Sequence, residues 1–143
     1  MSERLRPRRA TAADIQTLAE LNAQLIVDEG SDNPMTVPQL AERMSEWLAG
    51  RYRAVLFDIE SEAAAYVLYR DDGESVYVRH FFVTRAHRRS GVGREAMTLL
   101  MNEVFPPEKR VVVDVLARNA RGLAFWHALG FTDYLLTLER RAV

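Results

Sequence analysis

A short segment rich in arginine and glycine has the residue types needed to bind a phosphate group. Its seven residues are Arg88, Arg89, Ser90, Gly91, Val92, Gly93 and Arg94. The two glycines lack a Cβ, so the main chain can approach a ligand closely. An apolar stretch precedes the segment and residues at helical spacing follow it, which places a helix N-terminus beside these glycines. Free backbone N–H groups, the helix dipole and the arginine charges all favour an anion, so we predict a pyrophosphate site.

Two common phosphate-binding loops do not match this segment. A P-loop NTPase needs a lysine directly after the last glycine, and Arg94 stands there. The dinucleotide pattern G-x-G-x-x-G needs a third glycine where Ala96 stands, and no strand–helix–strand unit of that type opens the chain. A purely structural alternative is a solvated basic turn whose glycines only begin a helix.

A second motif follows in the C-terminal third of the chain. The β-branched run from Val111 to Leu116 predicts a buried strand. Behind it come Asn119, Gly122, Phe125, Trp126, Gly130 and Phe131. For local reasons alone, the asparagine could cap a short helix and Gly130 could end it.

Together, R-x-x-G-x-G at 88–93 and this second motif resemble the GNAT superfamily of N-acetyltransferases, over the chain from Arg53 to the C-terminus. The resemblance implies acetyl-CoA as the cofactor, with its pyrophosphate on residues 88–94. It also implies that Asn119 and the aromatic residues Phe125 and Trp126 contact the pantetheine arm. A backbone N–H of Phe81, Phe82 or Val83 would polarise the thioester oxygen. Many members carry a tyrosine that protonates the leaving thiolate, and at that position this chain has Trp126.

The proton acceptor and the acceptor-binding residues are less clearly marked. Tyr77 and His80 are the candidates for a general base, because both lie on the strand that should border the cleft. Strict alternation places them on opposite faces of that strand, unless a bulge intervenes. Asp28 and Glu29 are candidates for attracting a cationic amine. The alternative for His80 is a structural histidine packed in the core. The alternative for Asp28 and Glu29 is a solvated acidic loop.

Composition limits the class of protein. The 143 residues suit one domain, residues 1–143, and the formal net charge of −1 argues against nucleic acid or an anionic membrane as a partner. No cysteine is present, which excludes disulfides, thiolate metal sites and a cysteine acyl-enzyme. The three histidines are scattered, so no metal site is predicted. Without a signal-like or membrane-spanning stretch, we expect a cytoplasmic protein, and a homodimer is an open possibility.

The elements that must position these residues follow from hydrophobic periodicity and from turn residues. The sequence predicts strands at 4–9, 53–59, 63–69, 75–84, 111–116 and 133–140, and helices after Thr11, Thr36, Gly91 and Asn119. Their order, β-αα-βββ-α-β-α-β, is that of the GNAT family. The expected fold is therefore an α/β sandwich with a mixed, mostly antiparallel sheet of six to seven strands and about four helices.

The function predicted from these features is direct transfer of an acetyl group from acetyl-CoA to a primary amine of a small molecule or peptide. A coenzyme A-binding sensor or regulatory module without turnover is the alternative, and the tryptophan at position 126 is the residue that favours it.

Overall fold

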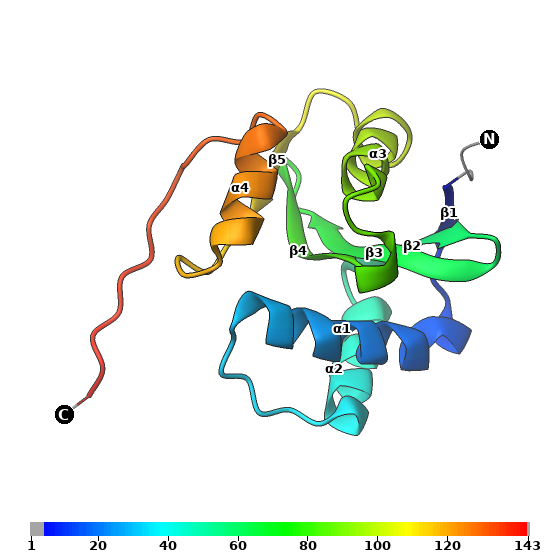
Figure 1. The fold of residues 1–143 in the computed structure, drawn as a ribbon, viewed down its shortest axis with the longest axis horizontal. Helices are drawn as coiled ribbons and strands as arrows, with labels where there is room; N and C mark the ends of the chain where they lie inside the picture. Colours follow the sequence, from blue (N-terminus) through cyan, green and yellow to red (C-terminus); the bar gives the residue numbers. More distant parts are fainter. Residues whose placement is uncertain (1–4, 143) are drawn as a thin grey trace.

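A central sheet separates two layers of helices (Figure 1). The computed structural model describes residues 5–142. The sheet has the order β1 (Arg6–Arg9), β2 (Tyr52–Ile59), β3 (Glu62–Asp71), β4 (Ser75–Val83) and β5 (Arg110–Val113). The helices are α1 (Ile15–Glu29), α2 (Val37–Ala49), α3 (Val92–Leu99) and α4 (Ala120–Ala128). A π-helical turn, Leu100–Val104, extends α3.

Local sequence signals explain most of the boundaries. Thr36 and Gln39 form a capping box at the start of α2, and Pro38 occupies its first turn, where a missing N–H costs nothing. Gly30 ends α1 with φ of 71°. Gly73, with φ of 93°, makes the tight turn between β3 and β4.

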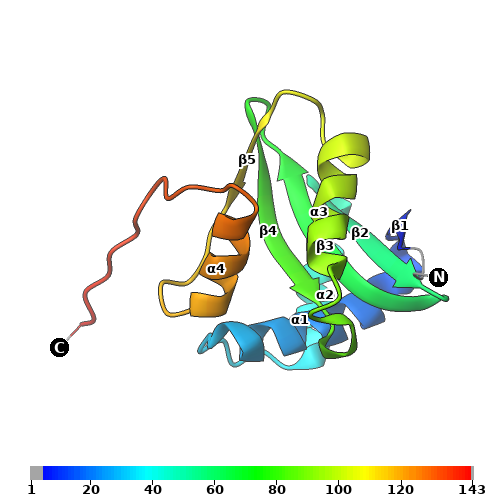
Figure 2. The ribbon, with the colours of Figure 1, turned by 45° about the horizontal axis from the view of Figure 1, so that its top comes forward.

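The two faces of the sheet carry different helices. Helices α1 and α2 pack on one face, where Leu18, Met44 and Tyr66 are among the core residues. Helix α3 packs on the other face with Ala96 and Leu100, and Trp126 of α4 joins the same cluster. Figure 2 shows α4 beside β4 and β5, with α3 crossing the sheet next to it.

The pairing of β4 with β5 is short and leaves part of β4 open. The first three strand pairs are antiparallel, but β5 runs parallel to β4, and only Ser75–Val78 find partners in Arg110–Val113. Among residues 5–142, no strand therefore pairs with the last five residues of β4, 79–83, on that side. The chain after β5 diverges from β4 and leads to α4, so the two segments form a wedge.

A bulge in β4 changes which side chains share a face. His80 pairs with Leu68 and Val78 pairs with Tyr69, so Arg79 is the extra residue. The alternation expected along this strand is therefore interrupted. Tyr77 and His80 both face the layer of α1 and α2, whereas Val78 and Phe81 face α3 and α4.

The sheet differs from the prediction at its ends. It has five strands within residues 5–142, not six to seven, because residues 133–140 join no ladder. That segment is exposed, and no strand of the described chain lies beside it to accept its hydrogen bonds. The strand predicted from Val111 ends at Val113, where the wedge opens. Of the predicted first strand, Arg4 lies outside the described residues. Within the described part of the chain, no helix is long and apolar enough to cross a bilayer.

Candidate active site

The wedge between β4 and the chain after β5 contains a cavity of about 430 Å³. Its walls come from the end of α1, the open part of β4, the loop before α3, the chain after β5, and α4. Of the residues singled out in the sequence, it is lined by Asp28, Glu29, Phe81, Phe82, Val83, Arg88, Arg89, Gly91, Val92, Gly93, Arg94, Asn119, Phe125 and Trp126. Ser90 lies in the same loop, whereas Tyr77 and His80 are not among the lining residues.

The loop before α3 has the geometry of an anion cradle. Arg89 and Gly91 both adopt left-handed conformations, with φ of 62° and 81°. Within residues 5–142, no hydrogen-bond acceptor meets the backbone N–H groups of Gly91, Val92 or Gly93. These amides therefore remain available to a ligand at the first turn of α3. A Cβ built on Gly91 meets no atom within 4 Å, so the space over the loop is open.

These features fit the pyrophosphate of coenzyme A. The pocket contains Arg89, Arg94 and Arg121, three exposed arginines that give its mouth a positive charge. Arg121 was not singled out in the sequence, although its place in the first turn of α4 follows from helical spacing. The free amides and these guanidinium groups are the donors that a diphosphate requires.

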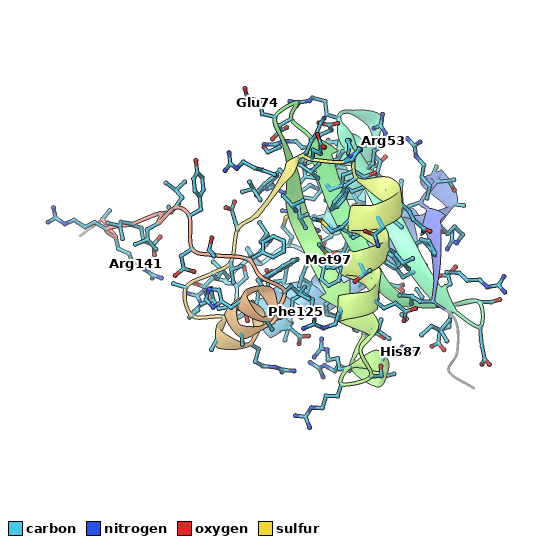
Figure 3. The ribbon with its side chains drawn as sticks, turned by 90° about the horizontal axis from the view of Figure 1, so that it is seen from above. Arg53, Glu74, His87, Met97, Phe125 and Arg141 are labelled. Atoms are coloured by element: carbon cyan, nitrogen blue, oxygen red, sulfur yellow. The ribbon has the colours of Figure 1, made fainter. Side chains whose placement is uncertain are left out.

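Aromatic side chains fill the space between β4 and α4. The rings of Phe81 and Phe125 stack, with centroids 5.6 Å apart and planes 14° from parallel. Trp126 meets both rings edge-on and also contacts Phe131. A Cβ on Gly93 would lie 2.8 Å from the ring of Phe125. Gly93 is thus required for close packing of α3 on α4; Figure 3 shows Phe125 on α4 and His87 in the turn that leads into α3.

Asn119 has a local role as well as a position in the pocket. Its side-chain oxygen accepts a hydrogen bond of 3.0 Å from the amide of Gly122 and so caps α4. A Cβ on Gly122 would lie 2.5 Å from the Asn119 amide nitrogen, so this glycine makes room for the cap. The cap and the pocket wall are therefore built by the same side chain.

The open part of β4 directs two backbone amides into the wedge. The amide of Thr84 bonds to the carbonyl of Ala64 and Phe82 pairs with Tyr66, which sets the hydrogen-bonding phase of the ladder with β3. The amides of Phe81 and Val83 then point away from β3. No strand of the described chain covers them on that side.

Asp28 forms ion pairs with two arginines from the loop region. Arg88 and Arg85 both donate to its carboxylate, and Arg88 also donates from Nε to the carbonyl of Val83, at 3.0 Å. Burial alone would raise the pKa of Asp28, but these hydrogen bonds hold it below its usual value. Asp28 therefore fixes Arg88 against β4, and its charge is already neutralised.

Glu29, the next residue, has no such partner. It lines the pocket at the end of α1 and forms no ion pair or side-chain hydrogen bond within residues 5–142. Partial burial, together with the negative charge of Asp28, raises the pKa of its carboxyl group. Glu29 is thus a carboxylate with increased proton affinity inside the pocket.

The two residues considered as bases on β4 are held in other interactions. Nδ1 of His80 and the hydroxyl of buried Tyr66 share a hydrogen bond of 3.1 Å, and Trp47 packs edge-on against the imidazole. Burial, with the positive charges of Arg43 and Arg79, lowers the pKa of His80 to about 3. The hydrogen bond to Tyr66 and the lowered pKa both disfavour His80 as a proton acceptor near neutral pH.

The side chain of Tyr77 does not line the pocket but extends from β4 to the chain after β5. Its hydroxyl donates to the carboxylate of Asp114 at 2.8 Å. Burial, followed by this hydrogen bond, raises the pKa of Tyr77 to about 12. Tyr77 therefore stays protonated at neutral pH and ties β4 to the chain after β5.

The buried imidazole should make the free energy of unfolding depend on pH. An unfolded chain binds a proton at His80 below about pH 6.5, whereas the folded chain does so only near pH 3. Stability should therefore fall as the pH drops between these values, by up to about 1.4 kcal/mol per pH unit. His80→Gln should flatten this slope, as measured by urea unfolding at several pH values between 7 and 4. An unchanged slope in the variant would rule out His80 as its source.

Comparisons with known proteins agree with this architecture. The sequence profile of the Acetyltransferase (GNAT) family matches residues 20–131. No curated protein matches the chain. Among solved structures, an aminoglycoside N-acetyltransferase in complex with CoA has a TM-score of 0.77 at 14% identity, over 97% of its chain and 99% of this one.

Two further structures are similar over nearly their whole length. A predicted acetyltransferase from Clostridium acetobutylicum, with acetyl-CoA, has a TM-score of 0.72 at 16% identity, over 96% of each chain. A ribosomal-protein-alanine N-acetyltransferase from Brucella melitensis has a TM-score of 0.78 at 14% identity, over 97% of this chain and 100% of that one. These likenesses describe the fold, and the family assignment comes from the profile. The chain belongs to the GNAT acetyltransferase family, whose members use acetyl-CoA.

Proposed function

We propose that this protein transfers an acetyl group from acetyl-CoA directly to a primary amine of a small molecule or peptide. The observation that carries the proposal is that one pocket contains the phosphate loop, the uncovered amides of β4 and the unpaired carboxylate of Glu29. These groups can hold the coenzyme, stabilise an oxyanion and accept a proton. Direct transfer to an amine that is protonated at neutral pH uses all three, and the absence of cysteine excludes a cysteine acyl-enzyme.

Residues from two motifs would hold the coenzyme. The amides of residues 91–93 and the surrounding arginines would bind the pyrophosphate. Asn119, Phe125 and Trp126 would border the pantetheine arm along α4. When bound, acetyl-CoA supplies the thioester that the amine attacks.

The amides of Phe81 and Val83 are suited to stabilising negative charge on the carbonyl oxygen. Both belong to a strand fixed by β3 on its other side, so they need no reorganisation as charge develops. Arg88 supports this geometry through its hydrogen bond to the carbonyl of Val83. We therefore assign the oxyanion site to these two amides.

Glu29 is the group that we assign to accept the proton of the attacking amine. Its raised pKa brings its proton affinity closer to neutral pH, which favours general base catalysis. Asp28 is tied to arginines, so of the two acidic residues only Glu29 is available to a cationic acceptor.

Departure of the thiolate needs no acid in this scheme. The indole of Trp126 has an N–H that can donate a hydrogen bond, but it has no acidic proton at neutral pH. A thiol with an ordinary pKa near 8.5 is an adequate leaving group without protonation. Trp126 then serves to pack the wedge, where it contacts Phe81 and Phe131.

The test is release of free thiol from acetyl-CoA across a panel of primary amines. A thiol reagent reports turnover without background, because the protein has no cysteine. Amine-dependent release is the expected result, and mass spectrometry should find the acetyl group on the amine. The alternative is a coenzyme A-binding sensor, for which Trp126 is the supporting residue. Tight acetyl-CoA binding without release for any amine would favour that sensor.

A further inference from the structure

One arginine of the pocket has neither a counter-ion nor a part in the coenzyme site. Arg79 lines the cavity from β4, and within residues 5–142 it forms no ion pair. Arg88, by contrast, is paired with Asp28. Arg79 is also exposed. Its positive charge is therefore available to a ligand in the cavity.

Two aromatic residues hold the Arg79 guanidinium in place. Its central carbon lies 4.6 Å from the centre of the Trp47 ring, and Nη1 donates a hydrogen bond of 3.3 Å to the Tyr52 hydroxyl. The bulge in β4 makes these contacts possible, because it turns Arg79 and His80 toward the same layer of helices. A guanidinium positioned in this way loses little conformational freedom when it binds a ligand.

A second arginine adds positive charge beside the first. The Arg43 guanidinium lies 4.4 Å from the centre of the Trp47 ring and donates to the side-chain oxygen of buried Asn22, at 3.3 Å. In the described part of the chain, its buried Nε has no hydrogen-bond partner, and no carboxylate pairs with it. Burial, followed by the charge of Arg79, lowers the pKa of Arg43. The two arginines therefore produce a positive field that attracts an anion.

The order of residues along β4 separates Arg79 from the phosphate loop. The amides of Phe81 and Val83, assigned above to the oxyanion, lie between Arg79 and the loop that includes Arg88. Arg79 precedes Phe81 by two residues, which is roughly 7 Å along a strand. With the pyrophosphate on the loop and the acetyl carbonyl at these amides, Arg79 lies on the side from which the acceptor enters.

We propose that the acceptor is a small amino acid whose carboxylate is bound by Arg79. This inference rests on the proposed acetyl transfer and names its substrate class. The ammonium group of the acceptor would lie toward Glu29, and its carboxylate would accept hydrogen bonds from Arg79. Because Arg79 is two residues from Phe81 on β4, the carboxylate and the reacting nitrogen should be several bonds apart. A diamine would instead place its second ammonium group beside Arg79 and Arg43, and like charges repel.

The first test is a series of unbranched amino acids with a terminal amine, from glycine to 8-aminooctanoate. Each acid is compared with its primary amide, which has the same size without the charge. At the preferred length, kcat/KM should be about 10-fold higher or more for the acid, as expected for a charge-assisted hydrogen bond. Added salt should reduce this ratio. Preference for 1,6-diaminohexane over every acid of the series would overturn the proposal.

Variants of Arg79 test which residue provides the preference. Arg79→Gln should lower kcat/KM for the acid to the value for the amide and leave the amide unchanged. Arg79→Lys keeps the charge and should retain part of the ratio. Arg6→Gln, exposed on β1, is the control and should retain all of it. A decrease of equal size for acid and amide in Arg79→Gln would show that Arg79 has only a structural role.

Binding of the products separates the anion site from the reaction. Calorimetric titration of the N-acetyl acids and their amides into protein saturated with coenzyme A requires no turnover. The preferred acid should bind about 10-fold more tightly or better, and Arg79→Gln should remove the difference. Such a difference in a protein that acetylates no amine would support the anion site and refute acetyl transfer. Equal binding and equal kcat/KM for acids and amides would refute the anion site and leave acetyl transfer intact.

Discussion

Glu29→Gln should lower kcat by roughly 10²- to 10⁴-fold, which is the usual contribution of a positioned general base. Glutamine keeps the size and polarity of the side chain but cannot accept the proton of the amine. Binding of acetyl-CoA should be unchanged, because the phosphate loop and the aromatic residues of α4 do not involve Glu29. Steady-state kinetics and calorimetric titration would measure the two effects separately.

The pH dependence of this variant gives a sharper criterion. A base works only when it is unprotonated, so kcat/KM of the wild type should fall as the pH drops through the pKa of Glu29. Burial raises that pKa, so the fall should begin above the ordinary range for a glutamate. Glu29→Gln should lack this limb, and its defect should shrink at high pH, where the free amine needs no base. Glu20→Gln, exposed on the same helix, should keep the wild-type profile. If Glu29→Gln kept the wild-type kcat, Glu29 would not be the general base.

Gly91→Glu should weaken acetyl-CoA binding by about 100-fold or more, through loss of charge-assisted hydrogen bonds to phosphate and addition of a repelling charge. The position is sensitive because its backbone is left-handed and a side chain there would enter the open space over the loop. Calorimetric titration with acetyl-CoA would measure the loss. Circular dichroism would show whether the fold is retained.

A matched control separates strain from loss of the anion site. Gly73 also has a left-handed backbone, with φ of 93° against 81° at Gly91, and a Cβ at either position meets no atom within 4 Å. Gly73→Glu therefore has comparable strain and the same added charge, but it lies in the turn between β3 and β4. It should lose stability without losing acetyl-CoA affinity. Equal affinity in both variants would show that the loop does not bind the pyrophosphate.

Local signals in the sequence predicted the parts of the fold that local chemistry determines. The capping residue Thr36, the turn at Gly73 and the glycines before α3 each act over a few residues, so their types suffice. The motif at residues 88–93 likewise marked one wall of the pocket. The structure confirms the predicted order of the elements up to α4, and the family profile confirms the predicted family.

The rest depends on contacts between distant segments. The bulge at Arg79 comes from the register with β3, and it decides that His80 faces Tyr66 and Trp47. Asp28 and Glu29 are adjacent in sequence, yet only one of them meets arginines from 57 and 60 residues away. Neither result could be read from periodicity, because both depend on tertiary packing. The same holds for residues 133–140. Their adjacent leucines, Leu135 and Leu136, interrupt the alternation of a strand, but this pattern alone does not tell whether another strand lies beside them, and within residues 5–142 none does.

The short ladder between β4 and β5 has a consequence for folding and motion. β2, β3 and β4 are joined by tight turns, so this meander has low contact order and should form early. β5 pairs with β4 only after the chain has passed through α3, and four residue pairs hold it there. We expect its amides to exchange with deuterium by local opening well before those of β3, so that the C-terminal third behaves as a separate, weaker cooperative unit. Ligands that bridge the two units would couple them, and the melting temperature should then rise with coenzyme concentration.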